Sequence, residues 1–213
     1  MDTRLETRSQ RDADIMNIYR KLHGETVGTL KRIYKRLRGG HVLRYHTRPE
    51  LMDGQNVAAH TWRTVVILHT LWPDVSKNCL LNMLYHDVAE AETGDMPATT
   101  KWRYPELNEL MARVERDYEN SIGVGDTVYK VTDDERAMCD IADKLELVFH
   151  CYRLMQQGNT LANDVFLKGV GYLQEKYLEK EFFEPVKEIL NALTSEYHKP
   201  PRLQVTLEQF SNL

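Results

Sequence analysis

The 213-residue sequence predicts an all-α helical bundle. Apolar residues recur at helical spacing through most of the chain, and no run shows the period of two that a half-buried strand requires. Glycine and proline gather at a few breaks between these segments. The length suits one domain with a substantial core, with or without terminal extensions.

Composition and charge exclude several broad classes of protein. The net charge is −4, so the chain as a whole does not favour nucleic acid or a membrane surface. The three cysteines are odd in number and none are spaced C-x-x-C, which argues against a disulfide framework. Residues 1–14 lack the apolar core of a signal peptide, and the aliphatic run Val65–Leu68 is too short to span a bilayer. We therefore expect a soluble cytoplasmic protein.

Two helices are expected near the N-terminus. Residues 1–11 are polar and are expected to be disordered. Helices are predicted over 12–22 and 26–37, and Gly39-Gly40 ends the second. The second helix carries the basic run Lys31–Arg38, which we interpret as a solvated face rather than a nucleic-acid site. The period of this run directs three apolar side chains inward: Ile33, Tyr34 and Leu37.

The middle of the chain is expected to alternate between helices and loops. Residues 41–54 form an irregular segment, and a helix over 55–72 stops at Pro73. The next helix runs over 75–91, followed by a loop at 93–97 that contains glycine and proline.

The C-terminal half is expected to be helical almost throughout. Pro105 suits the first turn of a helix that reaches residue 121. Thr132 precedes an acidic first turn and predicts the N-cap of a helix that ends near Gln157. Two further helices are predicted over 161–178 and 181–197. We divide the chain into three parts: an N-terminal extension (1–25), a main domain (26–198) and a C-terminal tail (199–213).

Three separate segments carry potential ligands for one divalent metal: His60, the adjacent pair His86-Asp87, and Asp143. Imidazole nitrogens and carboxylate oxygens suit Zn, Co, Mn, Ni or Fe. Apolar neighbours predict that His86 and Asp87 lie on a largely buried helix, where a charged pair needs a partner. Asp140, three residues before Asp143 on the same helical face, is an alternative ligand. His69 and His150 are expected to be ordinary core or surface residues.

Nearby charged residues indicate a phosphate substrate. Glu90 follows His86 by one helical turn, so its carboxylate can orient a metal-bound water without being a ligand. Asp95 can protonate a leaving alkoxide. Two carboxylate ligands neutralise a divalent ion, and a phosphate dianion would then need further cations. The candidates in sequence are Arg44, Arg48, Arg63, Lys101 and Arg103.

The order of these residues resembles the HD-domain phosphohydrolase superfamily. More narrowly, it is similar to the 5′-deoxynucleotidase group and to related phage deoxynucleoside triphosphate (dATP) hydrolases. The resemblance covers about residues 40–178. The matching motifs are Arg44-Tyr45, Asn56-Val57-Ala58-Ala59-His60, His86-Asp87-Val88-Ala89-Glu90, Thr93-Gly94-Asp95-Met96-Pro97 with Lys101, and Ala142-Asp143 before Leu145.

The resemblance implies an HD-domain helical bundle and a role for each matched residue. The metal ligands would be His60, His86, Asp87 and Asp143. Glu90 would orient the attacking water and Asp95 would assist proton transfer. Arg44 and Lys101 would bind phosphate. Tyr45 stands where the family has a tryptophan near the sugar, and Ala59 replaces a frequent glutamate. The resemblance also implies a homodimer or a higher homo-oligomer.

Four functions are compatible with these residues. A 5′-deoxynucleotidase acting on monophosphates is expected first, and a dATP-type triphosphohydrolase is the alternative. A cyclic nucleotide or dinucleotide phosphodiesterase often has additional histidine ligands, and no well-spaced histidine occurs between Glu90 and His150. A non-catalytic module that keeps a metal only for structure would need neither Glu90 nor Asp95, so the presence of both argues against it.

Overall fold

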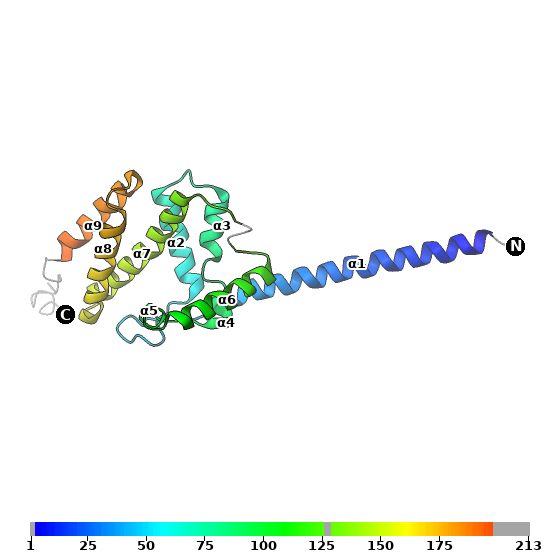
Figure 1. The fold of residues 1–213 in the computed structure, drawn as a ribbon, viewed down its shortest axis with the longest axis horizontal. Coiled ribbons are helices and arrows are strands. Elements are labelled where there is room, and N and C mark those ends of the chain that lie inside the picture. Colours follow the sequence, from blue (N-terminus) through cyan, green and yellow to red (C-terminus); the bar gives the residue numbers. More distant parts are fainter. Residues whose placement is uncertain (1–2, 126–128, 198–213) are drawn as a thin grey trace, which may run out of the picture.

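The computed structural model describes residues 3–125 and 129–197, and this part of the chain is all-α (Figure 1). Its α-helices are α1 (Thr3–Gly39), α2 (Val57–Leu71), α3 (Lys77–Tyr85), α4 (Glu90–Thr93), α5 (Ala98–Arg103), α6 (Pro105–Ile122), α7 (Asp133–Gln156), α8 (Asn163–Tyr177) and α9 (Glu184–Tyr197). Short 3₁₀ turns, η1 (Thr160–Ala162) and η2 (Glu181–Phe183), precede α8 and α9. None of the described helices is long and apolar enough to cross a membrane.

A single helix, α1, replaces the two helices and the disordered start expected near the N-terminus. The prediction was wrong because Gly24, near the expected break, costs a helix about 1 kcal/mol without ending it. The hydroxyl of Thr26 donates to the Leu22 carbonyl across the expected gap, at 2.9 Å. The boundary expected at residue 25 therefore lies inside α1, and the expected tail lies outside the described residues.

The basic run at the end of α1 is oriented differently from the prediction. Ile33, Tyr34 and Leu37 are exposed rather than inward. Arg36 instead faces the domain, and its guanidinium donates to the Ile122 carbonyl at the end of α6, at 2.7 Å. A cation beside the last carbonyls of a helix satisfies them and favours the negative end of the helix dipole. This contact directs the apolar residues away from the domain.

Helix α3 ends earlier than expected, and this changes how the His86-Asp87 pair is held. The predicted helix over 75–91 is divided into α3 and α4 by a turn at residues 86–89. His86 uses its own side chain on the last turn of α3, with Nδ1 2.7 Å from the Met83 carbonyl. The backbone then tightens, because the Val88 and Glu90 amides bond three residues back rather than four.

Helices α2, α6, α7, α8 and α9 agree closely with the prediction, whereas the short helix α5 was not predicted. The Asn56 side chain caps α2, and Thr132 and Glu135 form a reciprocal capping box at the start of α7. Helix α7 runs through the middle of the bundle, where it packs against α2 on one side and α8 on the other (Figure 1). Its buried residues form the main core with those of α8 and α9. This core fixes α2 and α7 against each other, and the candidate site lies between them.

Candidate metal centre

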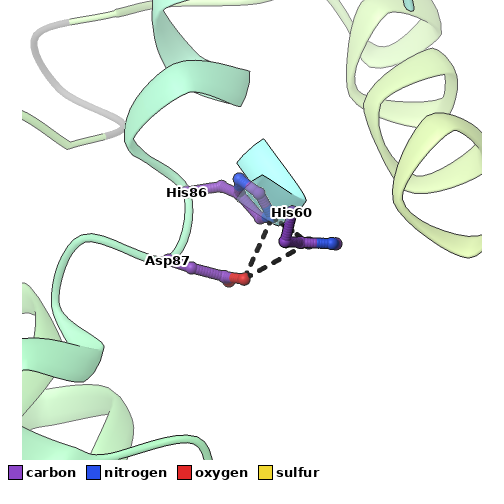
Figure 2. A group of neighbouring side chains, drawn as sticks. All are labelled: His60, His86 and Asp87. Atoms are coloured by element: carbon purple, nitrogen blue, oxygen red, sulfur yellow. Dashed lines mark hydrogen bonds and ion pairs between the residues drawn. The ribbon is translucent and has the colours of Figure 1, made fainter. Parts of the chain in front are cut away.

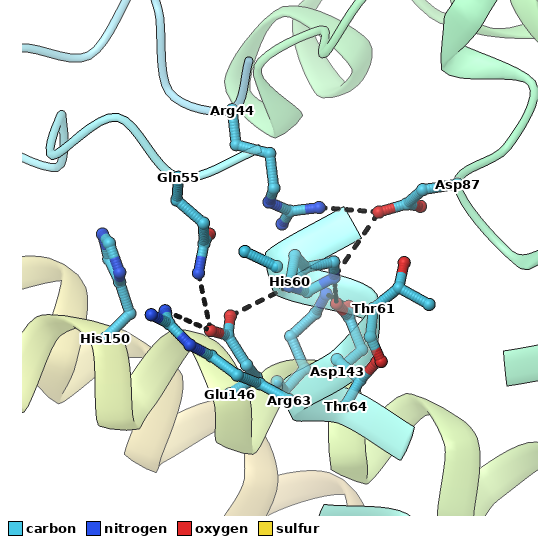
Figure 3. Close-up of polar contacts among 12 residues, drawn as sticks. Arg44, Gln55, His60, Thr61, Arg63, Thr64, Asp87, Asp143, Glu146 and His150 are labelled. Atoms are coloured by element: carbon cyan, nitrogen blue, oxygen red, sulfur yellow. Dashed lines mark hydrogen bonds and ion pairs between the residues drawn. The ribbon is translucent and has the colours of Figure 1, made fainter. Parts of the chain in front are cut away.

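The four predicted ligands come together from three elements. His60 is on α2, His86 and Asp87 are in the turn after α3, and Asp143 is on α7. One ligand atom from each of His60, His86 and Asp87 lies within 4.8 Å of the others (Figure 2). Asp143 closes the group, with Oδ1 3.1 Å from His60 Nε2 and 3.9 Å from His86 Nε2. The fully buried His60 lies at the centre of these contacts (Figure 3).

The hydrogen bonds of both imidazoles fix which nitrogen faces the site. His60 Nδ1 lies 2.9 Å from the Glu146 carboxylate, and His86 Nδ1 contacts the Met83 carbonyl. Both partners are acceptors, so each Nδ1 carries a proton and donates it. In the neutral rings Nε2 is then an acceptor, and the two Nε2 atoms are only 3.2 Å apart.

A cation fits this arrangement. Two imidazole lone pairs and oxygens of two carboxylates face one small volume, and they repel one another unless positive charge lies between them. The donor types suit Zn, Co, Mn, Ni or Fe, as expected. A carboxylate or carbonyl behind each ligating imidazole is typical of protein metal sites.

The electrostatic field of the cluster favours positive charge. Burial lowers the pKa of His86, but the charges of Asp87 and Asp143 outweigh burial and raise this pKa to about 9. Burial raises the pKa of Asp87, yet His86 and Arg44 hold it below its usual range. The pKa of Asp143 is also lowered, because His60 and Lys144 outweigh its burial. The field that attracts a proton to the cluster attracts a metal ion in the same way.

Glu146 is part of the site, although it was not anticipated from the sequence. It lies three residues after Asp143 on the same face of α7, and only 2% of it is exposed. Besides His60, its carboxylate accepts from Gln55 Nε2 at 2.8 Å and from Arg63 at 3.4 Å (Figure 3). The spacing from Asp143 was the available signal, since residues three apart share a helical face.

Glu90 lies beside the cluster, at the first position of α4. Its Oε2 atom is buried and has no hydrogen-bond partner among the described residues. Burial and then the charge of Asp87 raise the pKa of Glu90 to about 8, and the nearby charges of Arg44 and Lys101 partly offset this rise. An unpartnered buried carboxyl atom next to a metal site is suited to holding a water molecule.

Arg44 and Tyr45 come from the segment before α2. Arg44 Nη1 lies 2.6 Å from Asp87 Oδ2, and Arg44 Nε is buried without a partner in the described structure. Tyr45 has a left-handed backbone, with φ of 58°. Its amide donates to Asp95 Oδ2 at 2.6 Å, and its ring stacks on His150 with centroids 5.0 Å apart. Asp95 is therefore tied to the segment that carries Arg44.

Several residues that the sequence suggested as metal ligands or phosphate-binding cations make other contacts in the structure. Asp140 does not join the cluster; its carboxylate accepts from Tyr172, Lys176 and Tyr177. Of the candidate cations, Arg48 pairs with Glu50, and Arg63 pairs with Glu146. Lys144 was not among those candidates, and its Nζ lies 2.7 Å from Asp143 Oδ2. His150 is a buried core residue, as expected.

A family model matches the part of the chain that carries this site. The model of the "5′-deoxynucleotidase YfbR-like" family matches residues 41–173, more than half of the chain. The chain belongs to the YfbR-like family. All four predicted metal ligands lie inside the matched region, whereas α1 lies outside it.

A phage protein is similar to this chain over part of its sequence. A dATP triphosphohydrolase of Cyanophage S-2L is 38% identical over 90 residues, which cover 38% of this chain and 49% of that protein. The match thus spans about half the length of this relative.

Solved structures share the fold of the YfbR-like chain. A conserved hypothetical protein from Pyrococcus furiosus has a TM-score of 0.60 at 18% identity, over 78% of this chain and 99% of that chain. The Cyanophage S-2L HD phosphohydrolase DatZ, bound to dA and one catalytic Zn²⁺, has a TM-score of 0.53 at 21% identity, over 76% and 96%. The expected all-α HD-domain bundle is confirmed.

Proposed function

We propose that this YfbR-like protein is a divalent-metal-dependent phosphohydrolase of deoxynucleotides, and most specifically a 5′-deoxynucleotidase acting on monophosphates. One observation carries the proposal. His60, His86, Asp87 and Asp143 converge on one small volume, and the unpartnered carboxyl atom of Glu90 lies beside them. A purely structural metal site does not need this carboxylate.

His60, His86, Asp87 and Asp143 would hold the divalent ion, which would supply Lewis-acid chemistry toward water and the phosphate. Glu90, whose ionised form the charge of a bound ion would favour, holds the attacking water and accepts its proton. Asp95, fixed by the Tyr45 amide, delivers a proton to the leaving 5′-oxygen. The P–O bond to the nucleoside breaks as the new P–O bond forms, so the products are a nucleoside and orthophosphate.

Two cations are proposed to bind the phosphate. Arg44 is already oriented by Asp87, and its buried Nε is available to an incoming oxygen. Lys101 on α5 contributes positive charge on the side of Glu90. A phosphate dianion would form charge-assisted hydrogen bonds with these two side chains.

A triphosphohydrolase is the second candidate. The observation that favours it is the 38% identity to the phage dATP triphosphohydrolase. The two activities break different bonds, because a triphosphohydrolase releases tripolyphosphate in one step. We also propose that the protein works as a homodimer or a higher homo-oligomer, as its family resemblance implies.

The deciding experiment is product identification. Metal-stripped protein is refilled with Mn²⁺ or Co²⁺ and incubated with mono- and triphosphates of all four deoxynucleosides and their ribose forms. Orthophosphate from deoxynucleoside monophosphates supports the nucleotidase, and tripolyphosphate supports the alternative. Turnover of none of these nucleotides with any divalent metal would exclude both.

A matched pair of variants tests the role of Glu90. Glu90→Gln should bind metal like the wild type but lose at least a hundredfold in kcat, since general-base assistance contributes about 10²–10⁴-fold. Glu92→Gln is the control, because Glu92 lies on the same short helix and pairs with Arg38 on the surface. Full activity of the Glu90 variant would show that this role is wrong.

A further inference from the structure

Two thiols face each other between α3 and α7. Cys79 is the third residue of α3, and Cys139 lies in the second turn of α7. Their Sγ atoms are 3.5 Å apart, and both cysteines are free. Cys79 is fully buried and Cys139 is 8% exposed. Neither thiol takes part in the proposed reaction, so their contact needs a separate explanation.

The separation of the thiols suits an intramolecular disulfide. The two sulfurs of a disulfide lie about 2.05 Å apart, so closure would shorten the present distance by about 1.5 Å. The third cysteine, Cys151, is further along α7 and belongs to the separate core that α7 forms with α8 and α9. The pair is therefore defined by its position, and Cys151 provides a matched control.

The hydrogen bond between the thiols makes them chemically unequal. The bond from Cys139 lowers the pKa of the Cys79 thiol below its usual range, although burial opposes this effect. The same bond, followed by burial, raises the pKa of Cys139. The first turn of a helix also favours negative charge, and Cys79 lies in the first turn of α3. Cys79 is thus the better nucleophile, and Cys139 is the partner that keeps its proton.

The thiols share a small core with residues that position the metal ligands. The buried residues of this core are Leu68, Cys79, Met83, Cys139 and Ala142. The Met83 carbonyl contacts His86 Nδ1, and Ala142 directly precedes Asp143. His86 follows Cys79 within about two helical turns, and Asp143 follows Cys139 within about one. Both helices therefore run from the thiols toward the metal centre.

Formation of the bond would move α3 and α7 relative to each other. The neighbours of the thiols are closely packed, so the sulfurs cannot approach by side-chain rotation without displacing them. Metal–ligand distances tolerate a change of only about 0.2 Å. If a fraction of the shift of about 1.5 Å reaches His86 or Asp143, the ligand geometry is disturbed.

We propose that Cys79 and Cys139 form a reversible disulfide on exposure to hydrogen peroxide, and that this bond weakens the binding of a divalent ion at the metal centre. The effect on the ion rests on the proposed function, whereas the cross-link does not. Hydrogen peroxide is the oxidant because a buried pair is accessible to a small molecule and not to a bulky disulfide.

The reaction consumes one peroxide for each disulfide. The Cys79 thiolate attacks one peroxide oxygen, the O–O bond breaks, and the leaving hydroxide becomes water with the proton that the thiol had released. The sulfur of Cys139 then displaces the hydroxyl group from Cys79, and this group leaves as water with the Cys139 proton. The sulfurs are oxidised and the peroxide oxygens are reduced. A small dithiol reverses the bond by thiol–disulfide exchange and supplies both electrons.

Mass spectrometry of the full-length protein tests the cross-link. Reduced, metal-free protein is treated with hydrogen peroxide, and linked peptides are identified in a non-reducing digest. Wild type and Cys151→Ala should both link Cys79 to Cys139, whereas Cys79→Ala should form no intramolecular link. Dithiothreitol should restore the free thiols. The absence of a link between Cys79 and Cys139, or a link to Cys151 in its place, would overturn the proposal.

Binding of Mn²⁺ tests the effect on the metal centre. This ion prefers oxygen ligands to thiolates, so the cysteines themselves do not compete for it. In calorimetric titration, oxidised wild type should bind Mn²⁺ about 10–100-fold more weakly than reduced wild type, the range typical when the support behind metal ligands is disturbed. Dithiothreitol, removed before titration, should restore the affinity.

Cys79→Ala is the control for oxidation of other residues, and peroxide should leave its affinity for Mn²⁺ unchanged. Equal affinity in reduced and cross-linked wild type would overturn the proposed effect on the metal centre, and so would an equal loss in Cys79→Ala. A reduced wild type that binds no Mn²⁺ would instead contradict the proposed metal site, and the digest would still show whether the thiols pair.

Discussion

The Glu146 carboxylate lies 2.9 Å from Nδ1 of His60 and holds the opposite nitrogen of that ring toward the candidate metal centre. Glu146 is almost fully buried and also accepts from Gln55. The pKa of Glu146 stays below its usual range, because its bonds to His60 and Gln55 outweigh the effect of burial. A carboxylate held ionised in this position fixes the tautomer of His60 and strengthens it as a ligand.

Glu146→Gln should therefore weaken metal binding without removing a ligand. Loss of such a supporting carboxylate typically costs about 10–100-fold in metal affinity, and we expect a loss in this range. Calorimetric titration of the stripped protein with Zn²⁺ measures it. Glu92→Gln provides the control for loss of one carboxylate. Unchanged affinity in Glu146→Gln would mean that the His60 tautomer is fixed in another way.

Two aspartates on α7 should separate metal binding from stability. Asp143→Asn should abolish tight metal binding, because Asp143 Oδ1 faces both imidazoles. Asp140→Asn should retain metal, since Asp140 bonds to Tyr172 and Tyr177 instead. Metal content after dialysis, measured by mass spectrometry, compares the two variants. Loss of metal in the Asp140 variant but not in the Asp143 variant would show that Asp140, and not Asp143, is the ligand.

Asp140 should also make stability depend on pH. Burial raises its pKa, but bonds from Tyr177, Lys176 and Tyr172 outweigh burial and lower it. A lowered pKa in the folded state gives stability that is present above the unfolded value near 4 and is lost as pH falls through the folded value. Asp140→Asn should cost about 1–2 kcal/mol at pH 7, a range reduced for its partial exposure.

Thermal unfolding of both proteins at pH 7 and pH 3 tests this dependence. The difference in Tm between wild type and Asp140→Asn should shrink at the lower pH. A difference that stays constant from pH 7 to pH 3 would show that the carboxylate charge contributes nothing.

Tyr45 should influence sugar selectivity. The family resemblance implies that it stands in place of a tryptophan, and its ring contacts both the Arg44 guanidinium and His150. Tyr45→Trp should raise the ratio of kcat/KM for deoxyribose over ribose substrates by several-fold, because the larger ring would reach further toward the 2′ position. Paired assays on dAMP and AMP provide the ratio. An unchanged or lower ratio would show that Tyr45 does not contact the sugar.

The sequence predicts the bundle well because helix signals are local. Thr132 and Pro105 mark helix starts by chemistry that depends only on neighbouring residues. The turn at His86 was missed because no glycine or proline marks it. Where α3 ends, the His86 ring bonds to the Met83 carbonyl, and propensity alone does not reveal this contact.

The site was predicted in part, because its motifs are also local in the sequence. Motif spacing brought forward His60, His86, Asp87 and Asp143, and the structure places them together. Glu146 and the partners of Arg63 were not visible, because they depend on how α2 packs against α7. The orientation of α1 was predicted wrongly, since periodicity shows that a helix has an apolar face but not which side the domain occupies.

The central claim is that His60, His86, Asp87 and Asp143 hold one divalent ion on which hydrolysis depends. The most direct measurement is the rate of phosphate release from deoxynucleotides as stripped protein is titrated with Mn²⁺ or Co²⁺, alongside Asp87→Ala. We predict that the activity of the wild type returns in proportion to metal and saturates at one ion per chain, while the variant neither binds the ion nor recovers activity. Full activity in stripped wild type, or recovery in Asp87→Ala, would contradict the account.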